Sequence, residues 1–257
     1  MLVLLSCAKT MSAVSKVKVP LTTSPRFQKE AAEIALQMSQ FSVDELERLL
    51  RVNAKIAVEN YKRYQAFHAE ATPELPALLA YTGIVFKRLN PKDFSAEDFG
   101  YAQEHLRLTS FCYGLLRPLD VIRAYRLEGD VVLPELGNQT LFSYWRSRLT
   151  DTFIEDIRSA GGILCNLASD EMKSLFDWKR VESEVRVVTP EFHVWKNGKL
   201  ATIVVYTKMS RGEMTRFILK NKIGNPEELK GFSWEGFEFD ESLTDEKKLV
   251  LINGMGE

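Results

Sequence analysis

The sequence lacks the residues from which disulfide frameworks and metal centres are usually built. Its 257 residues include three cysteines and three histidines, and none of these shows the spacing of a disulfide scaffold or a metal-ligand set. Unpaired cysteines are typical of a reducing compartment. We therefore expect no disulfide, no metal and no other cofactor.

A long hydrophobic segment and a large net charge are also missing. The apolar start MLVLL is too short for a signal peptide or a transmembrane helix, so we expect a cytoplasmic protein without membrane contact. The formal net charge of −1 excludes a globally basic nucleic-acid-binding protein. Binding of a polyanion would therefore require a local basic patch. A chain with almost no net charge can have such a patch if its acidic residues gather elsewhere, and residues 235–246 are such an acidic cluster.

The chain is long enough for a substantial core, because 45% of its residues are hydrophobic. No repeat or linker divides it, so we expect one domain over residues 1–257. Apolar runs at 1–5 and 163–169 predict buried strands, and Asn197-Gly198 between alternating apolar runs predicts a β-hairpin. The expected fold class is α+β, with a mixed sheet core flanked by helices.

Apolar residues at helical spacing predict the helices. A capping box at Ser95 starts a long helix that continues towards Gly114, and another at Ser210 places a helix start after a strand that ends at Lys208. Further helices are expected over 43–51, 52–68 and 141–159.

Arginines and tyrosines are densest in residues 101–128. An arginine is always charged and carries five donors, so such a cluster indicates a surface that holds an anion or stacks a base. The alternative is that the arginines pair with nearby carboxylates on a solvated face. Lys9 and Lys208, each at the expected end of a strand, are further candidates for anion binding. The candidate DNA- or anion-binding residues are Lys9, Arg107, Arg117, Arg126, Lys208, Arg211 and Arg216.

Small polar and acidic residues at the ends of two strands form a second candidate site. Open α/β sheets place ligand contacts at the carboxyl ends of their strands. Carboxylates beside a lysine are suited to acid–base chemistry on a small anionic ligand such as a nucleotide. No nucleophile is assigned, because Ser169 lacks the flanking glycines of a nucleophile elbow. The catalytic candidates are Ser6, Lys9, Asn166, Ser169, Asp170 and Glu171.

The turn Tyr81-Thr82-Gly83 lies between two short helical segments of the stretch 77–89. A glycine turn between helices is how a helix-hairpin-helix module presents backbone N–H groups to a DNA phosphate without reading sequence. The alternative is a turn between packed helices. Tyr81, Tyr113 and Tyr125 are candidates for base stacking.

Several stretches together resemble one family. LLSCAKT, HLRLTSFCYGLLRPLD followed by AYRLE, NLASDE and KMSRGEMTRFI are similar to the bacterial YaaA-type peroxide-stress proteins, at similar spacing along the whole chain. The resemblance implies a cytosolic protein that is induced by hydrogen peroxide, limits oxidative, iron-linked damage and binds DNA. It also implies a basic cleft and a helix-hairpin-helix-like element. Where the family usually has proline, this chain has Cys7.

Two functions follow as expectations. The first is DNA binding without sequence specificity, to duplex or branched DNA, through a basic cleft. The second is an enzyme that acts on a small anionic or nucleotide-like ligand in the same cleft. An enclosed pocket favours the small ligand, and an open groove as wide as a duplex favours DNA. Direct iron handling is disfavoured, because no dense set of cysteine, histidine and carboxylate ligands is present.

Overall fold

The computed structural model describes residues 1–254, so the end of the expected domain, 255–257, lies outside the described residues. The α-helices are α1 Gln28–Met38, α2 Val43–Leu50, α3 Ala54–Ala66, α4 Ala77–Ala80, α5 Ile84–Leu89, α6 Ala96–His105, α7 Leu141–Ser159, α8 Trp178–Glu184 and α9 Val204–Asn221. Short 3-10 helices are η1 Pro91–Asp93, η2 Pro134–Leu136, η3 Asp170–Leu175 and η4 Pro226–Gly231.

The strands are β1 Leu2–Leu5, β2 Glu74–Pro76, β3 Leu106–Ser110, β4 Gly114–Leu116, β5 Val121–Arg123, β6 Val132–Leu133, β7 Gln139–Thr140, β8 Ile163–Asn166, β9 Arg186–Lys196, β10 Lys199–Ala201, β11 Phe237–Phe239 and β12 Lys248–Asn253. The main sheet has the order β11-β12-β9-β8-β1-β3-β4, and β10 pairs with β9. The pairs between β12, β9, β8, β1 and β3 are parallel, and β11 and β4 are antiparallel to their neighbours. The expected mixed sheet flanked by helices in one compact α+β domain is confirmed.

The strand order reverses its direction at β1. The chain moves from β1 to its neighbour β3 and then returns to the other side of β1 with β8. At such a switch point the connections leave the sheet in opposite directions, which opens a crevice at the carboxyl ends of the two central strands. The residues after β1, β3 and β8 therefore meet at one edge.

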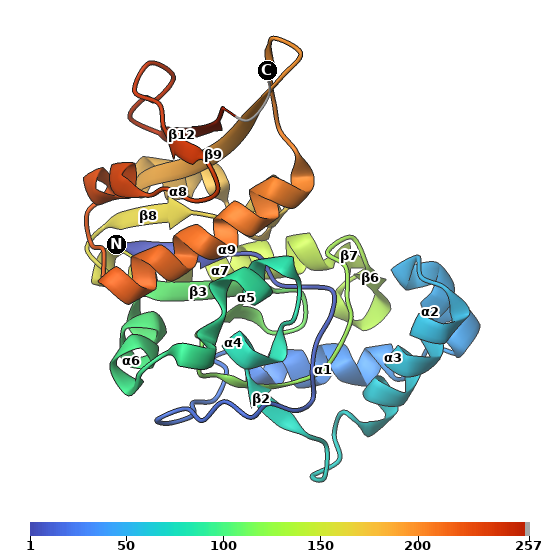
Figure 1. Cartoon of the computed structure of the whole chain (residues 1–257). Coiled ribbons are helices and arrows are strands. Elements are labelled where there is room, and N and C mark those ends of the chain that lie inside the picture. The colour runs from blue at the N-terminus through green and yellow to red at the C-terminus, as the bar shows by residue number, and fades with distance from the viewer. Residues whose placement is uncertain (255–257) are drawn as a thin grey trace.

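Helices cover both faces of the sheet. The long helix α9 crosses the near face, with α7 and α8 behind the sheet, while α2 and α3 form a lobe at the side (Figure 1). α5 packs directly on α9. A Cβ added to Gly212 of α9 would lie 2.3 Å from the carbonyl oxygen of Val85 in α5, so only glycine permits this approach.

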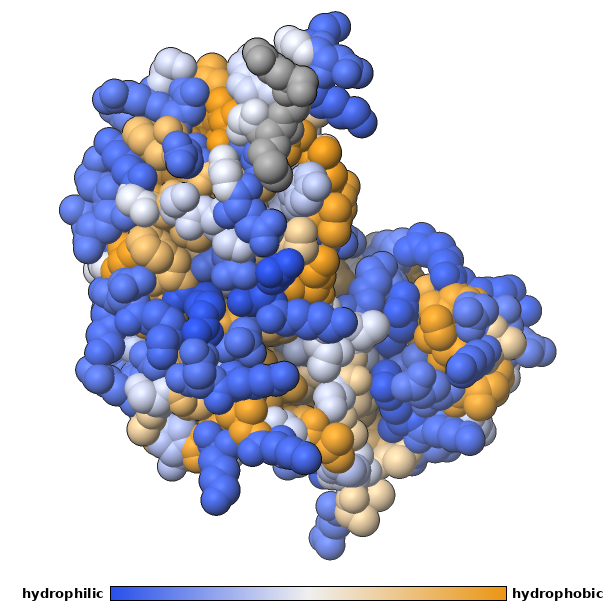
Figure 2. All heavy atoms as spheres, in the orientation of Figure 1, coloured by the Kyte–Doolittle hydropathy of each residue, from blue (hydrophilic) through white to orange (hydrophobic). Residues whose placement is uncertain are grey.

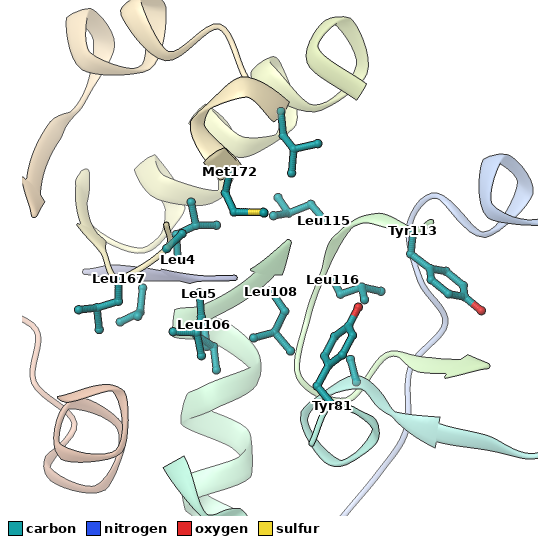
Figure 3. Close-up of a cluster of buried hydrophobic side chains, with 14 of the residues drawn as sticks. Leu4, Leu5, Tyr81, Leu106, Leu108, Tyr113, Leu115, Leu116, Leu167 and Met172 are labelled. Atoms are coloured by element: carbon teal, nitrogen blue, oxygen red, sulfur yellow. The ribbon is translucent and has the colours of Figure 1, made fainter. Parts of the chain in front are cut away.

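The central strands are buried on both faces and hold the core together. Leu2, Leu4 and Leu5 of β1 are fully buried, and leucines of β1 and β3 gather beside Tyr81 and Met172 in the core (Figure 3). This near-continuous apolar character is typical of parallel strands that are covered on both sides.

Several local predictions are confirmed. The strands at 1–5 and 163–169 are present as β1 and β8, and the helices at 43–51, 52–68 and 141–159 as α2, α3 and α7. Asn197 and Gly198 both have positive φ and connect β9 to β10 as the expected tight hairpin. As a separate finding, residues 1–254 contain no helix long and apolar enough to cross a membrane.

The long helix predicted from Ser95 is wrong beyond His105. α6 ends there, and LRLTS forms the central strand β3, whose Leu108 is fully buried. Periodicity does not separate a short buried helix from a buried strand, and the pairing of β3 with β1 decides the outcome.

The strand predicted to end at Lys208, with a cap at Ser210, is also wrong. β10 ends at Ala201, and α9 begins at Val204, so Ser210 lies inside a helix with a buried side chain. The β-branched run before Lys208 favours a strand locally, but packing against α5 stabilises a helix. Lys208 and Arg211 are therefore neighbours on one helical face rather than residues at a helix start.

Candidate ligand-binding cavity

A cavity of about 320 Å³ lies at the carboxyl ends of the central parallel strands. Its lining includes the loop 6–10 after β1, Phe111 after β3 and Leu167, Ser169, Glu171 and Met172 after β8. The start of α5, the segment 125–127 and two residues of α9 complete the walls. Figure 2 shows the surface hollowed between the body of the molecule and the lobe of α2 and α3.

Two serines join the loops after β1 and β8. The backbone N–H of Ser169 donates to Oγ of Ser6 at 2.9 Å, and the two hydroxyl oxygens are 3.2 Å apart. Because β1 and β8 are adjacent parallel strands, their ends bring these residues together from positions far apart in the sequence. The pair gives the cavity a hydroxyl-bearing edge.

One buried carboxylate forms ion pairs with two of the cations that line the cavity. Glu128 has a side chain only 7% exposed, and its oxygens lie 2.9 Å from Nζ of Lys9 and 3.6 Å from the guanidinium of Arg126. The hydroxyl of Tyr64 on α3 donates to the carbonyl oxygen of Arg126 at 2.6 Å and holds this segment in place. This one carboxylate therefore offsets about one of the two positive charges of Lys9 and Arg126.

The cations on α9 are different. Lys208 and Arg211 line the cavity one turn apart, and neither side chain makes a hydrogen bond or ion pair within residues 1–254. Burial lowers the pKa of Arg211, and the charge of Asp170 opposes that shift in part. A half-buried guanidinium without a partner is costly, so this wall favours an incoming anion.

Buried polar atoms without hydrogen bonds concentrate around this cavity. In the described part of the chain they are Nε of Arg126, Nδ2 of Asn166, Oγ of Ser210 and Nε of Arg211. Two of these residues line the cavity, and the other two precede lining residues in the sequence. Buried polar groups are rarely left unpaired, and the two arginine nitrogens call for an acceptor from outside the protein.

Tyr125 and Cys7 form part of the remaining wall. Tyr125 lines the cavity, and its hydroxyl lies 2.7 Å from that of Tyr81 and 2.6 Å from that of Ser110. Cys7 lines the same wall, and burial raises the pKa of its thiol to about 12. The thiol is therefore protonated at neutral pH and a poor nucleophile.

Comparison with known proteins identifies the family. Residues 1–243 match the family described as peroxide stress protein YaaA. The chain belongs to the peroxide stress protein YaaA family. It is 98% identical over its full length, and that of the relative, to a UPF0246 protein of Bacteroides thetaiotaomicron. A UPF0246 protein of Crocosphaera subtropica is 37% identical over 98% of this chain and 100% of its own. Membership supports a role in the response to oxidative stress.

In this YaaA-family protein, four of the seven expected anion-binding residues line the cavity: Lys9, Arg126, Lys208 and Arg211. The other three do not line it, and each pairs with a carboxylate. Arg107 is buried against Asp156 at 2.7 Å, Arg117 lies 2.9 Å from Asp120 and Arg216 pairs with Asp93. Their expected part in anion binding stays a prediction, and these contacts give each of them a structural role.

The candidate catalytic residues divide in the same way. Ser6, Lys9, Ser169 and Glu171 line the cavity. Asn166 is buried and its amide oxygen accepts from the N–H of Ala168, while Asp170 is exposed and pairs with Lys173. Glu171 makes no hydrogen bond or ion pair with the described residues, so its carboxylate is available to a ligand.

The expected hairpin at Tyr81-Thr82-Gly83 connects α4 to α5 and faces the loop after β1. The N–H of Thr82 donates to the carbonyl oxygen of Thr10 at 3.0 Å, and a Cβ added to Gly83 would lie 2.9 Å from Cβ of Ala8. Tyr81, Tyr113 and Tyr125 are all buried, so they present no ring face at the molecular surface. A DNA contact by this turn stays a prediction.

Sequence reasoning missed the apolar wall and the buried Glu128. Phe86 lies in α5, Phe111 in the turn after β3 and Leu127 in the loop after β5, and their spacing in the sequence carries no sign of a shared cavity. Glu128 follows Arg126 by two residues, and that local charge pair is a signal from which it could be found. Among residues 1–254, clusters of three or more potential metal ligands are absent.

Proposed function

We propose that this YaaA-family protein serves the response to hydrogen peroxide by binding a small anionic ligand in the cavity. The observation that carries the proposal is the unpaired guanidinium of Arg211, whose buried Nε lacks a hydrogen-bond partner in a cavity that also holds Lys208. Four cations and one carboxylate, Glu171, line the cavity, and Glu128 behind it neutralises part of that charge. The remaining positive charge favours an anion.

The size and enclosure of the cavity support a small ligand. Pockets for small molecules usually measure about 300–1,000 Å³, and a volume of about 320 Å³ lies at the lower end of that range. A DNA duplex is far too wide to enter, and could contact only the rim.

A test in cells uses a strain from which the gene has been deleted and in which variants replace it. Arg211→Met should leave the strain as sensitive to hydrogen peroxide as the deletion, at a protein level equal to that of the wild type. Lys87→Met removes an exposed lysine of α5 that does not line the cavity, and it should restore resistance fully. Full resistance with Arg211→Met would contradict the proposal.

DNA binding is the second candidate, and exposed lysines favour it. Lys16 and Lys18 lie on the segment that leaves the cavity after Lys9, and neither makes an ion pair with the described residues. Lys9 itself has a side chain 64% exposed. Lysines of this kind contact phosphates without reading sequence, and each contact adds about 0.9 to the salt dependence of binding.

Fluorescence anisotropy with labelled duplex, single-stranded and branched DNA separates the two candidates. If DNA is the ligand, replacing both Lys16 and Lys18 by alanine should weaken binding to every sequence and reduce the slope of log affinity against log salt by about 2. Absence of binding at low salt would remove this candidate and leave the small anion.

A further inference from the structure

We infer that the anion of the cavity is the phosphate of a single nucleotide unit, and that its base occupies the apolar part of the same cavity. The inference rests on the proposed function, because it names the ligand of that site. It comes from the way polar and apolar groups are distributed around the cavity.

The cationic end of the cavity lies on α9. Lys208 and Arg211 face the cavity from one side of the helix, and Gly212 fixes that helix against α5. Lys9 and Arg126 share the single carboxylate of Glu128, whereas the two cations of the α9 wall have no carboxylate partner among the described residues. A phosphate is a strong acceptor for an arginine nitrogen and a lysine ammonium.

Much of the remaining lining is apolar and deeply buried. Phe86, Phe111, Leu127, Leu167 and Met172 are each at most 4% exposed, yet they line the cavity. Inorganic phosphate would leave this surface in contact with water. A ligand that fills the cavity must therefore join an anionic group to an apolar, flat body, and a nucleobase is such a body.

The other polar groups of the lining match a nucleotide better than a fatty acid or an aromatic acid. Glu171 has no partner among the described residues and accepts hydrogen bonds, which suits an exocyclic amino group or ribose hydroxyls. The hydroxyls of Ser6 and Ser169 stand at the same edge. A hydrocarbon chain would make no hydrogen bond with these groups, and Glu171, which is exposed, would bond to water instead.

The volume limits the ligand to one nucleotide unit. A cavity of about 320 Å³ is too small for a dinucleotide cofactor and admits one nucleotide. The bound nucleotide can be of two kinds: a free nucleoside monophosphate, or one nucleotide that is turned out of a DNA or RNA strand. The second source requires the unit to unstack, and it would place the rest of the strand along the exposed rim.

Isothermal titration calorimetry at constant ionic strength tests the inference. The titrants are adenosine and uridine 5′-monophosphates, adenosine, ribose 5-phosphate, inorganic phosphate and a single-stranded dodecanucleotide. At least one nucleotide should bind about tenfold or more tightly than phosphate or adenosine alone, because both ends of the cavity are engaged.

Two variants separate the ends of the cavity. Arg211→Met should weaken nucleotide and phosphate alike by about tenfold or more. Ile84→Trp places a large side chain at the half-buried start of α5, where Ile84 lines the cavity, and it should remove the advantage of the nucleotide over phosphate. Lys87→Met, a matched loss of one charge outside the cavity, should change neither affinity.

The outcomes distinguish a failure of the proposed anion site from a failure of the nucleotide inference. Phosphate binding that depends on Arg211, with no nucleotide bound more tightly, overturns the nucleotide inference and leaves the anion site. No binding of any titrant overturns both. Binding of the dodecanucleotide alone, sensitive to Ile84→Trp, assigns the unit to a strand, and binding of a monophosphate assigns it to the free nucleotide.

Discussion

The same substitution at two arginines should have opposite effects on stability. Arg211 carries a buried Nε without a partner, whereas Arg107 donates to Asp156 at 2.7 Å and to the carbonyl oxygen of Leu106 at 2.9 Å. Methionine keeps much of the length of the arginine stem and removes the charge in both cases. The comparison therefore isolates what the guanidinium does in each place.

The magnitudes follow from these contacts. Removing an unsatisfied buried donor should stabilise the ligand-free protein, by roughly 1–3 kcal/mol for Arg211→Met. Arg107→Met removes the nearer partner of the largely buried Asp156 carboxylate, which keeps only Arg26 at 3.2 Å, and the substitution should cost about 1–3 kcal/mol. For a chain of this size, each 1 kcal/mol moves the melting temperature by about 2–4 °C.

Thermal and urea unfolding in a buffer without phosphate or sulfate measures both variants. We expect Arg211→Met to melt several degrees above the wild type and Arg107→Met well below it. A loss of stability in Arg211→Met as large as that in Arg107→Met would show that Arg211 has partners in the folded protein. That result would refute the reasoning behind the anion site.

Three further predictions concern the thiol, the helix contact and pH. The Cys7 thiol, with its pKa raised to about 12, should resist iodoacetamide and hydrogen peroxide at pH 8 and react once urea unfolds the chain; mass spectrometry of the labelled peptide measures this. Gly212→Ala, whose Cβ would meet the Val85 carbonyl oxygen, should cost about 1–3 kcal/mol in urea unfolding. The hydrogen bonds from Arg216 lower the pKa of Asp93 below its ordinary value of 3.8. This pair stabilises the fold fully above pH 3.8, and the stabilisation is lost as pH falls below 3.8 through the lowered pKa, so Arg216→Gln should flatten the stability profile below about pH 4.

The parts of the site that lie at strand ends could be predicted from the sequence. Ser6, Lys9, Ser169 and Glu171 follow two buried apolar runs, and the carboxyl ends of parallel strands meet at one edge of a sheet. Each apolar run predicts a buried strand, and the polar residues that follow it lie at the carboxyl end of that strand. This is why these four residues reach one cavity from positions more than 150 apart in the sequence.

The parts that depend on tertiary contacts could not be predicted. Arg117 lies three residues before its partner Asp120, so the pairing has a local signal, whereas Asp156 lies 49 residues from Arg107 and is found only in the folded chain. The start of α9 was missed because its β-branched residues favour a strand until α5 packs against Gly212.

The measurement that tests the central claim most directly is the melting temperature of the wild type and of Arg211→Met with and without 10 mM anion at constant ionic strength. Inorganic phosphate and a nucleoside monophosphate serve as the anions. The account predicts that the wild type starts lower and rises with an anion, while Arg211→Met starts higher and does not respond. An equal rise in both proteins, or no rise in the wild type, would contradict an anion site at Arg211.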